Sequence, residues 1–321
     1  MKHNKVLYAI FCVVLVSCVG AIGWAQVSTS GSINYEDVAL LRWYPAIQTG
    51  NTFKVGSEPL ALAFDGAHMW VANYGDGTVT KLRAADGTKL GTFYVGGNPI
   101  GVAFDGASIW VTTYWGNNVT KLRASDGANQ GTFSVGGNPW GIAFDGSSVW
   151  VANQFRNTVT KLRAVDGVIL GTYQVGNDPA GVAFDGANVW VANEQDTTVT
   201  KLRVSDGGNL GTFRVGSNPY ALAFDGANIW VTNLAGSVSK LRARDGANLG
   251  TYPVGSDPDG VVFDGNNIWV ANNGDKNVTK LRAADGANLG TFSVGQYPSG
   301  MAFDGANIWV ANRHDGTVSK Q

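Results

Sequence analysis

One ten-residue phrase recurs seven times along this chain. It reads FDGANIWVAN at residues 303–312 and FDGASIWVTT at residues 104–113. The spacing between successive copies is 40 residues, except for one interval of 39. The phenylalanines that begin the copies are Phe64, Phe104, Phe144, Phe184, Phe224, Phe263 and Phe303. A period of this length is typical of a repeat architecture, in which each unit buries its apolar surface against its neighbours.

Each unit contains four short segments rich in β-forming residues. In the unit at residues 98–137 these segments are 101–104, 109–112, 119–122 and 132–135, and Asp-Gly or Asn-Pro pairs occur between them. Such pairs favour tight turns, because Gly adopts positive φ at no steric cost. Beyond residue 25 no stretch shows helical periodicity over the length a helix needs. Four antiparallel strands per unit of about 40 residues, repeated seven times, predict an all-β, seven-bladed β-propeller.

The two ends of the chain are predicted to share one blade. Residues 38–55 resemble the second half of a unit, and the chain stops at residues 317–320, after the first half of the last unit. N- and C-terminal strands that pair would close the ring and remove the open sheet edge of an incomplete propeller. The propeller is therefore predicted to occupy residues 37–321.

The repeated tryptophan is predicted to form the core between blades. One Trp follows each FDG motif, on the opposite side of its strand from the flanking aliphatic residues. A buried Trp removes roughly 150–250 Å² from water, so the set would supply much of the apolar burial that folding needs. Its members are Trp70, Trp110, Trp150, Trp190, Trp230, Trp269 and Trp309.

Residues 1–25 resemble a secretory signal peptide, followed by a short linker at 26–36. Lys2 and Lys5 precede an uncharged apolar run at residues 6–24, and small residues flank a cleavage position after Ala25. Two alternatives stay open: lipidation of Cys18, which would make an outer-membrane lipoprotein, and an uncleaved membrane anchor. A periplasmic or secreted protein is predicted.

The chain after residue 25 carries neither cysteine nor a basic excess. Cys12 and Cys18 are the only cysteines of the full sequence, and both precede residue 25. No disulfide is therefore expected in the processed protein. Removing Lys2 and Lys5 from the 23 basic residues leaves 21 basic against 24 acidic residues. Such a balance gives no indication of a nucleic-acid partner, and no charge run points to a membrane surface.

The motifs WVAN and WVTN, with the preceding FDG and the following TVTKL and GTF-x-VG, resemble the YVTN-type β-propeller repeat of YncE-like exported proteins. The resemblance extends over residues 38–321 and implies a seven-bladed periplasmic or cell-surface propeller. Trp stands where the family has Tyr, and Thr113 replaces the motif's Asn, so the turn of that blade is expected to differ. Related propellers include the streptogramin lyase and lactonase groups, whose catalytic His or metal ligands do not map onto this chain.

Alternate loops of a blade lie at opposite ends of a propeller. The FDG and LRAxDG turns share one end, the constant end, where the copies are almost identical. The loops after WVAN and the VGxNP connections share the other, the variable end. Aromatic residues beside charged ones are typical of binding faces, although drift in solvent loops would also vary them. The candidate ligand-binding residues are Tyr74, Tyr114, Trp115, Trp140, Phe155, Arg156, Glu194, Tyr220, Asp259, Tyr297, Arg313 and His314.

The charged residues of the repeat are predicted to be structural. Seven Lys, from Lys81 to Lys320, six Arg, from Arg83 to Arg282, and thirteen Asp of the two Asp-Gly turns cancel in charge. They are expected to form exposed ion pairs of small individual stability. His68 is expected at the surface.

Catalytic signals are sparse. The sequence has no nucleophile elbow, P-loop or zinc-ligand spacing. His314, with Asp315 beside it, is a conceivable general base. The leading hypothesis is a monomeric binding scaffold for a protein, peptide or glycan of the cell envelope, without catalytic residues or a cofactor. Two alternatives stay open: a lyase- or lactonase-like enzyme, with a divalent metal held in the central channel by acids such as Asp259, and a purely structural cell-surface repeat protein.

Overall fold

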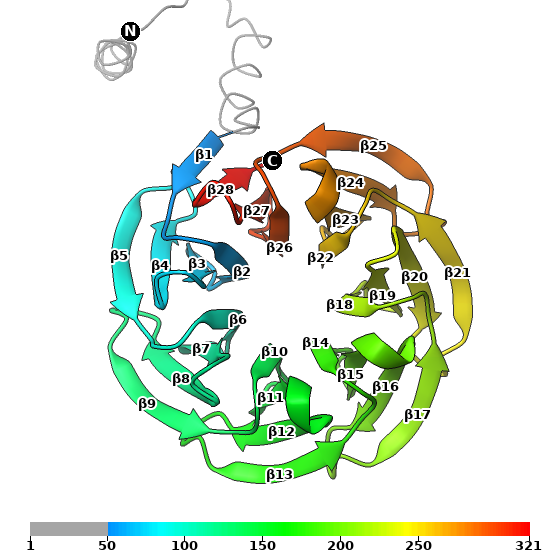
Figure 1. The fold of residues 1–321 in the computed structure, drawn as a ribbon, viewed down its shortest axis with the longest axis horizontal. Helices are drawn as coiled ribbons and strands as arrows, with labels where there is room; N and C mark the ends of the chain where they lie inside the picture. Colours follow the sequence, from blue (N-terminus) through cyan, green and yellow to red (C-terminus); the bar gives the residue numbers. More distant parts are fainter. Residues whose placement is uncertain (1–50) are drawn as a thin grey trace, which may run out of the picture. The chain divides into compact units, whose positions relative to one another are not determined.

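The computed structural model describes residues 51–321, which form seven four-stranded antiparallel sheets around a central axis (Figure 1). The predicted seven-bladed β-propeller is therefore confirmed. The predicted signal peptide, the linker and residues 37–50 lie outside the described residues, and so does Cys18. In the described part, no helix is long and apolar enough to cross a membrane.

In each blade the first strand is innermost and the fourth lies at the periphery (Figure 1). The first three blades are β2 (Pro59–Phe64), β3 (His68–Asn73), β4 (Thr78–Arg83) and β5 (Lys89–Tyr94); β6 (Pro99–Phe104), β7 (Ser108–Thr113), β8 (Asn118–Arg123) and β9 (Asn129–Ser134); and β10 (Pro139–Phe144), β11 (Ser148–Asn153), β12 (Thr158–Arg163) and β13 (Ile169–Gln174). The next three are β14 (Pro179–Phe184), β15 (Asn188–Asn193), β16 (Thr198–Arg203) and β17 (Asn209–Arg214); β18 (Pro219–Phe224), β19 (Asn228–Asn233), β20 (Ser237–Arg242) and β21 (Asn248–Pro253); and β22 (Pro258–Phe263), β23 (Asn267–Asn272), β24 (Asn277–Arg282) and β25 (Asn288–Ser293). Short 3₁₀ turns, η1 (Gln154–Arg156), η2 (Glu194–Asp196) and η3 (Asn273–Asp275), connect the second and third strands of three blades.

The last blade combines both ends of the described chain, as predicted. Its strands are β26 (Pro298–Phe303), β27 (Ile308–Asn312), β28 (Thr317–Lys320) and β1 (Asn51–Lys54). β1 pairs antiparallel with β28, with Phe53 opposite Val318. The Phe53 ring also stacks on Trp309, with centroids 5.4 Å apart. The N-terminal strand thus completes the sheet that the C-terminus leaves one strand short.

The Asp of each FDG motif holds both its turn and the following Trp. In the first blade, Asp65 Oδ1 accepts the backbone N–H groups of Ala67 and His68. Its Oδ2 accepts the indole N–H of Trp70 at 2.8 Å. His68, expected at the surface, is half-buried and lies with Nδ1 3.1 Å from the same carboxylate. One carboxylate therefore satisfies the hairpin and the polar atom of the buried indole.

The tryptophans lie between blades, as predicted. Six of the seven are fully buried, and Trp269 is 8% exposed. Trp190, for example, packs with Val199 of its own blade against Ile229, Val231 and Leu241 of the next. The large ring of one blade fills space over the aliphatic face of its neighbour, so the core consists of seven similar interfaces.

The prediction that the repeat lysines form exposed ion pairs is wrong. Lys201 is 6% exposed, and its Nζ lies 5.0 Å from the ring centroid of Trp190. The same Nζ donates a hydrogen bond to the backbone carbonyl of Ala243 in the next blade, at 2.6 Å. The aromatic face and the carbonyl compensate the buried ammonium, so this lysine binds adjacent blades together.

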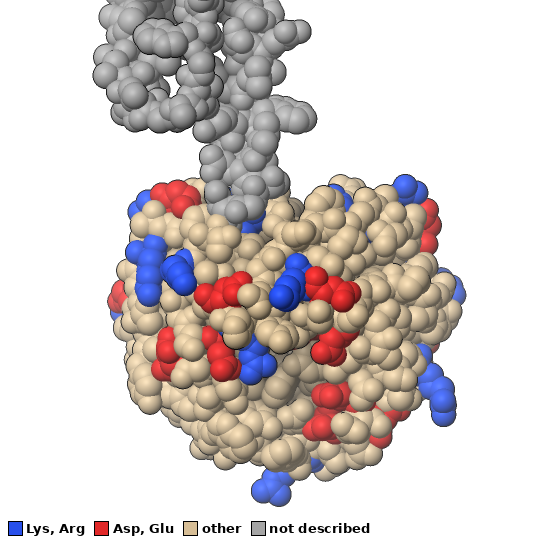
Figure 2. All heavy atoms as spheres, turned by 45° about the horizontal axis from the view of Figure 1, so that its top comes forward, with Lys and Arg blue, Asp and Glu red and all other residues tan. Residues whose placement is uncertain are grey.

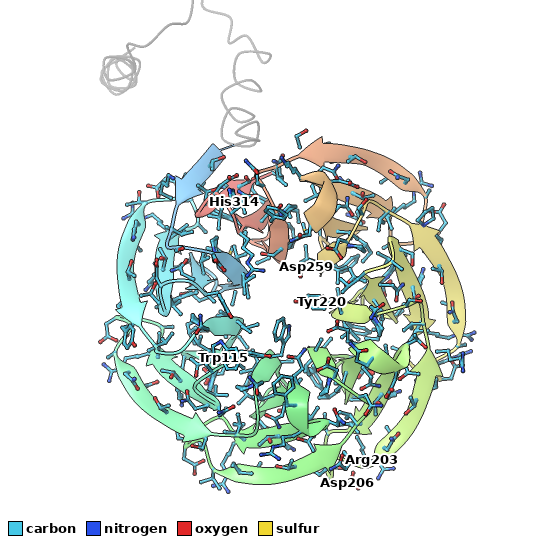
Figure 3. The ribbon with its side chains drawn as sticks, in the orientation of Figure 1. Trp115, Arg203, Asp206, Tyr220, Asp259 and His314 are labelled. Atoms are coloured by element: carbon cyan, nitrogen blue, oxygen red, sulfur yellow. The ribbon has the colours of Figure 1, made fainter. Side chains whose placement is uncertain are left out.

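The arginines of the repeat do form exposed pairs with aspartates of the LRAxDG turns. Arg203 Nη1 lies 2.8 Å from Asp206 Oδ2, and both side chains are about half exposed. Figure 3 shows this pair at the outer edge of the propeller. Figure 2 shows basic and acidic side chains interspersed on the face that it presents. This part of the prediction holds.

Candidate functional site

The innermost strands of the seven blades surround a central channel. It encloses a cavity of about 290 Å³, lined by residues of β2, β6, β10, β14, β18, β22 and β26. Small residues permit this close approach: a Cβ at Gly141 would collide with the carbonyl oxygen of Ala180 in the next blade. At the variable end, the residue after each loop Pro begins the channel wall. Of these, Leu60, Ile100, Trp140, Tyr220 and Asp259 line the cavity.

A continuous row of aromatic rings leads from the rim into the channel mouth. Tyr114 contacts Trp115, Trp140 and Phe155, with centroid distances of 4.8, 5.4 and 6.4 Å. Trp140 in turn lies 6.0 Å from Tyr220 at an interplanar angle of 74°. Trp115 and Phe155 are 62% and 66% exposed. The structure thus brings together five of the candidate residues that come from three blades.

Two threonines support the backbone of this mouth. In two copies of the WVAN motif, Thr112 and Thr232 replace the Ala of the third position. Thr112 Oγ1 donates to the carbonyl of Trp140 at 2.7 Å, and Thr232 Oγ1 donates to the carbonyl of Asp259 at 2.9 Å. The copies that carry Thr are therefore the ones whose next blade presents Trp140 or Asp259. Fixed backbone positions of this kind pre-organise a site.

Asp259 is the most perturbed acid of the mouth. Its side chain points into the central opening, close to Tyr220 (Figure 3). Burial in the channel wall raises the pKa of its carboxyl to about 7, although Arg313 acts to lower it; Asp257 adds to the increase. The residue still contacts solvent along the channel. A carboxyl that is half ionised near neutral pH can take or release a proton, or bind a cation.

Two further acids, Glu194 and Asp178, lie on the blade before that of Tyr220. Burial raises the pKa of Glu194, and the nearby carboxylate of Asp178 raises it further. Burial also raises the pKa of Asp178. Glu194 is in η2, which contacts β18, the strand of Tyr220. Burial raises the pKa of the Tyr220 hydroxyl well above its usual range, and the charges of Asp259 and Glu194 contribute.

Three further candidates, Tyr297, Arg313 and His314, line a smaller pocket beside the blade that closes the ring. The pocket encloses about 250 Å³ and is lined by Glu58, Asn273, Tyr297, Arg313 and His314. Arg313 Nη2 lies 2.9 Å from Glu58 Oε2, and the Tyr297 and His314 rings are 5.8 Å apart. Figure 3 shows His314 farther from the channel axis than Asp259.

Tyr74 and Arg156 complete the set of candidates. The Arg313 guanidinium lies over the ring of Tyr74, at 5.7 Å from its centroid. Arg156 is exposed and lines a separate surface groove with Phe155, Gly116 and Gly137. Tyr74 therefore joins the cluster around Arg313, whereas Arg156 does not reach the channel mouth.

The proposed pairing of His314 with Asp315 is not formed. Asp315 Oδ2 instead accepts the backbone N–H of Gln296 at 2.7 Å, and the His314 ring packs on Tyr297. The carboxylate that would orient the imidazole is engaged in holding the loop. This arrangement removes the geometric basis for His314 as an oriented base.

The turn after Thr113 differs from its counterparts in its hydrogen bonds. Elsewhere the motif's Asn binds the next strand, as where Asn73 Nδ2 donates to Thr78 and Thr80. Thr113 Oγ1 instead donates to Asn118 Oδ1 at 2.6 Å. The predicted difference is thus one of side-chain bonding, and the hairpin between β7 and β8 is retained.

Sequence reasoning missed Glu58 and Asp178. Both occupy the position before the loop Pro, where the backbone adopts the left-handed region, with φ of 50° and 57°. Asn or Asp occupies this position in five blades, and these residues tolerate such φ well. Glu58 and Tyr297 are the exceptions, and both line the smaller pocket. For Glu58, a bulky residue at a position that favours Asn was the available signal; Asp178 fits the pattern and gave none.

No group of three or more His, Cys, Asp or Glu side chains that could hold a metal ion occurs in residues 51–321. The hypothesis of a metal in the central channel concerned acids such as Asp259, which lines the cavity. The channel-metal hypothesis therefore stays a prediction.

The chain resembles known propellers in structure. A streptogramin B lyase structure superposes with a TM-score of 0.73 at 16% identity, covering 86% of this chain and 98% of the other. Kuenenia stuttgartiensis hydrazine synthase superposes with a TM-score of 0.71 at 17% identity, covering 84% and 94%. The chain matches no protein-family profile and no curated protein sequence. These likenesses establish the β-propeller fold.

Proposed function

We propose that this protein is an exported binding scaffold that recognises a protein, peptide or glycan of the cell envelope through the variable end of its propeller. The observation that carries the proposal is the row of aromatic rings from Trp115 and Phe155 through Tyr114 to Trp140 and Tyr220. Aromatic anchors that pass from an exposed rim into a concave pocket are typical of recognition sites.

The contrast between the constant end and the variable end supports a binding function for the variable end. Seven near-identical units build the rigid ring, and the Arg–Asp pairs of the constant end repeat with little change. The aromatic residues occur where the copies differ. We further propose membership of the YVTN-type, YncE-like group and a periplasmic or secreted location, on the basis of the WVAN repeat and the apolar N-terminus.

Capture of envelope components on the immobilised protein tests the proposal. The variant Trp115→Ala with Trp140→Ala should retain at least tenfold less ligand than the wild type, because it removes one exposed ring and one channel-lining ring of the aromatic row. Tyr94→Ala is the matched control, since Tyr94 is a 77% exposed aromatic residue on the outer strand β5. Equal retention by the double variant and the wild type would exclude this face.

An enzymatic role is the second candidate, and Asp259 is the observation that favours it. A carboxyl with a pKa of about 7 in the channel suits general acid–base chemistry. The structural likeness to streptogramin B lyase makes elimination a reaction to test. Turnover of a lyase or lactone substrate by the wild type, lost in Asp259→Asn, would favour this candidate over pure binding.

A further inference from the structure

The channel mouth gathers acidic groups without matching basic ones. Burial raises the carboxyl pKa of Asp178, Glu194 and Asp259, and a neighbouring carboxylate adds to the increase at Glu194 and at Asp259. Arg313 is the basic residue that acts on Asp259 and Tyr220, and its guanidinium is engaged by Glu58 at 2.9 Å. The mouth is therefore poised to accept positive charge.

Aromatic faces complete this environment. Trp140 and Tyr220 both line the channel cavity, and their rings meet at 74° with centroids 6.0 Å apart. Two such rings form adjacent walls of a corner, and the faces of indole and phenol attract cations through their quadrupoles. Aromatic walls with carboxylates beside them are the chemistry that recognises organic ammonium groups.

The position of the Asp259 carboxylate in the channel wall lowers the stability of the fold. In residues 51–321, no side chain donates a hydrogen bond to it, while Thr232 fixes its backbone carbonyl at 2.9 Å. An unpaired, largely buried carboxylate destabilises a fold. Equivalent positions in other blades carry Leu60, Ile100 and Ala180, which avoid that cost. A destabilising residue on an anchored backbone points to use by a ligand.

We propose that the variable mouth of the channel binds an aliphatic ammonium group, as a free amine or as a lysine side chain, between Trp140 and Tyr220 with Asp259 and Glu194 as its counter-charges. This inference rests on the proposed binding function and names the chemistry of its ligand. The cavity of about 290 Å³ suits one small head group.

Calorimetric titration of the full chain with paired probes tests the inference. Choline and its neutral isostere 3,3-dimethylbutan-1-ol form one pair. A glycine–lysine–glycine tripeptide and its norleucine counterpart form the other, and the pairs distinguish a small free ammonium compound from a peptide side chain. At least one cation should bind at least tenfold more tightly than its neutral partner. Binding of neither cation, or equal binding within both pairs, would overturn the inference.

Charge-removing variants locate the site. Asp259→Asn with Glu194→Gln should weaken binding of the cation at least tenfold at pH 8. Asp206→Asn should leave it unchanged, because Asp206 pairs with Arg203 at the outer edge of the constant end (Figure 3). Melting curves of both variants verify folding. Cation binding that survives the double substitution would place it elsewhere and contradict the inference.

Binding of the cation should also depend on pH. The wild type should bind more tightly at pH 8 than at pH 6, because the Asp259 carboxyl, with a pKa of about 7, ionises in this range. Arg313 and Asp257 act on this carboxyl, and Tyr220 is influenced by the charges of both Asp259 and Glu194. Asp259→Asn should remove most of the change, and a wild-type affinity that is flat between the two pH values would argue against Asp259 as a counter-charge.

Failure of this inference is distinguishable from failure of the proposed function. If an envelope ligand is captured through Trp115 and Trp140 but excess choline or lysine peptide does not displace it, the scaffold function stands and the cationic chemistry is wrong. A neutral oligosaccharide retained in this way would identify a glycan instead. If the wild type captures nothing that the aromatic double variant loses, the scaffold function itself fails.

Discussion

At the residue scale, single side chains that break the repeat distinguish the blades. Trp140, Tyr220 and Asp259 occupy one equivalent position on three innermost strands, and each lines the channel. The repeat specifies only that this position follows a Pro and faces the axis. Its side chain is consequently free to vary without disturbing the blade interfaces, so binding chemistry can change while the core stays constant.

Asp259 leads to a prediction about stability. Its pKa of about 7 in the folded protein exceeds the ordinary value of 3.8, so the folded state binds this proton more tightly than the unfolded chain. Its contribution to stability is therefore present below pH 4 and is lost as the pH rises through 7. Asp259→Asn should stabilise the protein by on the order of 1–3 kcal/mol at pH 8, because water in the open channel relaxes part of the roughly 1.4 kcal/mol per pH unit.

Chemical unfolding at pH 4 and pH 8 measures this effect. The variant's gain over the wild type should be large at pH 8 and close to zero at pH 4. An Asn variant that is no more stable than the wild type at pH 8 would show that burial does not penalise this carboxylate.

At the element scale, the hairpin between the third and fourth strands locks each blade to its predecessor. The ring of Tyr173, on β13, stacks on Trp150 with centroids 5.5 Å apart. It also covers Gly207, in the turn of the next blade, so closely that a Cβ there would collide with the ring. Phe53 of β1 makes the same contact with Gly87. The turn glycines are thus required by packing as well as by their positive φ.

Gly207→Ala tests this contact, with Gly226→Ala as its control. Both glycines have positive φ, of 71° and 95°, but no atom lies within 4 Å of a Cβ at Gly226. Both substitutions carry backbone strain, and only the first adds a collision. Gly207→Ala should therefore lower the free energy of unfolding by about 1–3 kcal/mol more than Gly226→Ala, as measured by denaturant unfolding. Equal losses would mean that the Tyr173 contact is not limiting.

At the scale of the whole molecule, the repeat predicted the fold, whereas the contacts that form the candidate site are seen only in the structure. A period of 40 residues with four β-rich segments was sufficient for seven blades, for buried tryptophans such as Trp190 and for pairing of the two ends. The burial of Lys201 could not be predicted, because the carbonyl that compensates its charge belongs to the next blade. Asp178 and Glu194, by contrast, lie in one blade, where the backbone N–H of Glu194 donates to the Asp178 carbonyl at 3.1 Å.

Of the candidate site, the sequence predicted which end varies, and five of its candidate residues form the aromatic row. It could not show that Tyr114 reaches Trp140 while Arg156 lines a separate groove, because contacts between blades depend on how each loop folds over its neighbour. Nor could it show that Asp315 accepts the backbone N–H of Gln296 while the His314 ring packs on Tyr297.

Closure of the ring is the claim on which the rigid variable end depends, and thermal unfolding of two shortened chains tests it most directly. A chain that begins at Asn51 retains β1, whereas one that begins at Ser57 lacks it and leaves β28 and Trp309 uncovered. We predict that the chain beginning at Ser57 melts at a clearly lower temperature, by about 5 °C or more, since an open edge and a lost aromatic contact remove several kcal/mol. Equal melting temperatures for the two chains would contradict closure by β1.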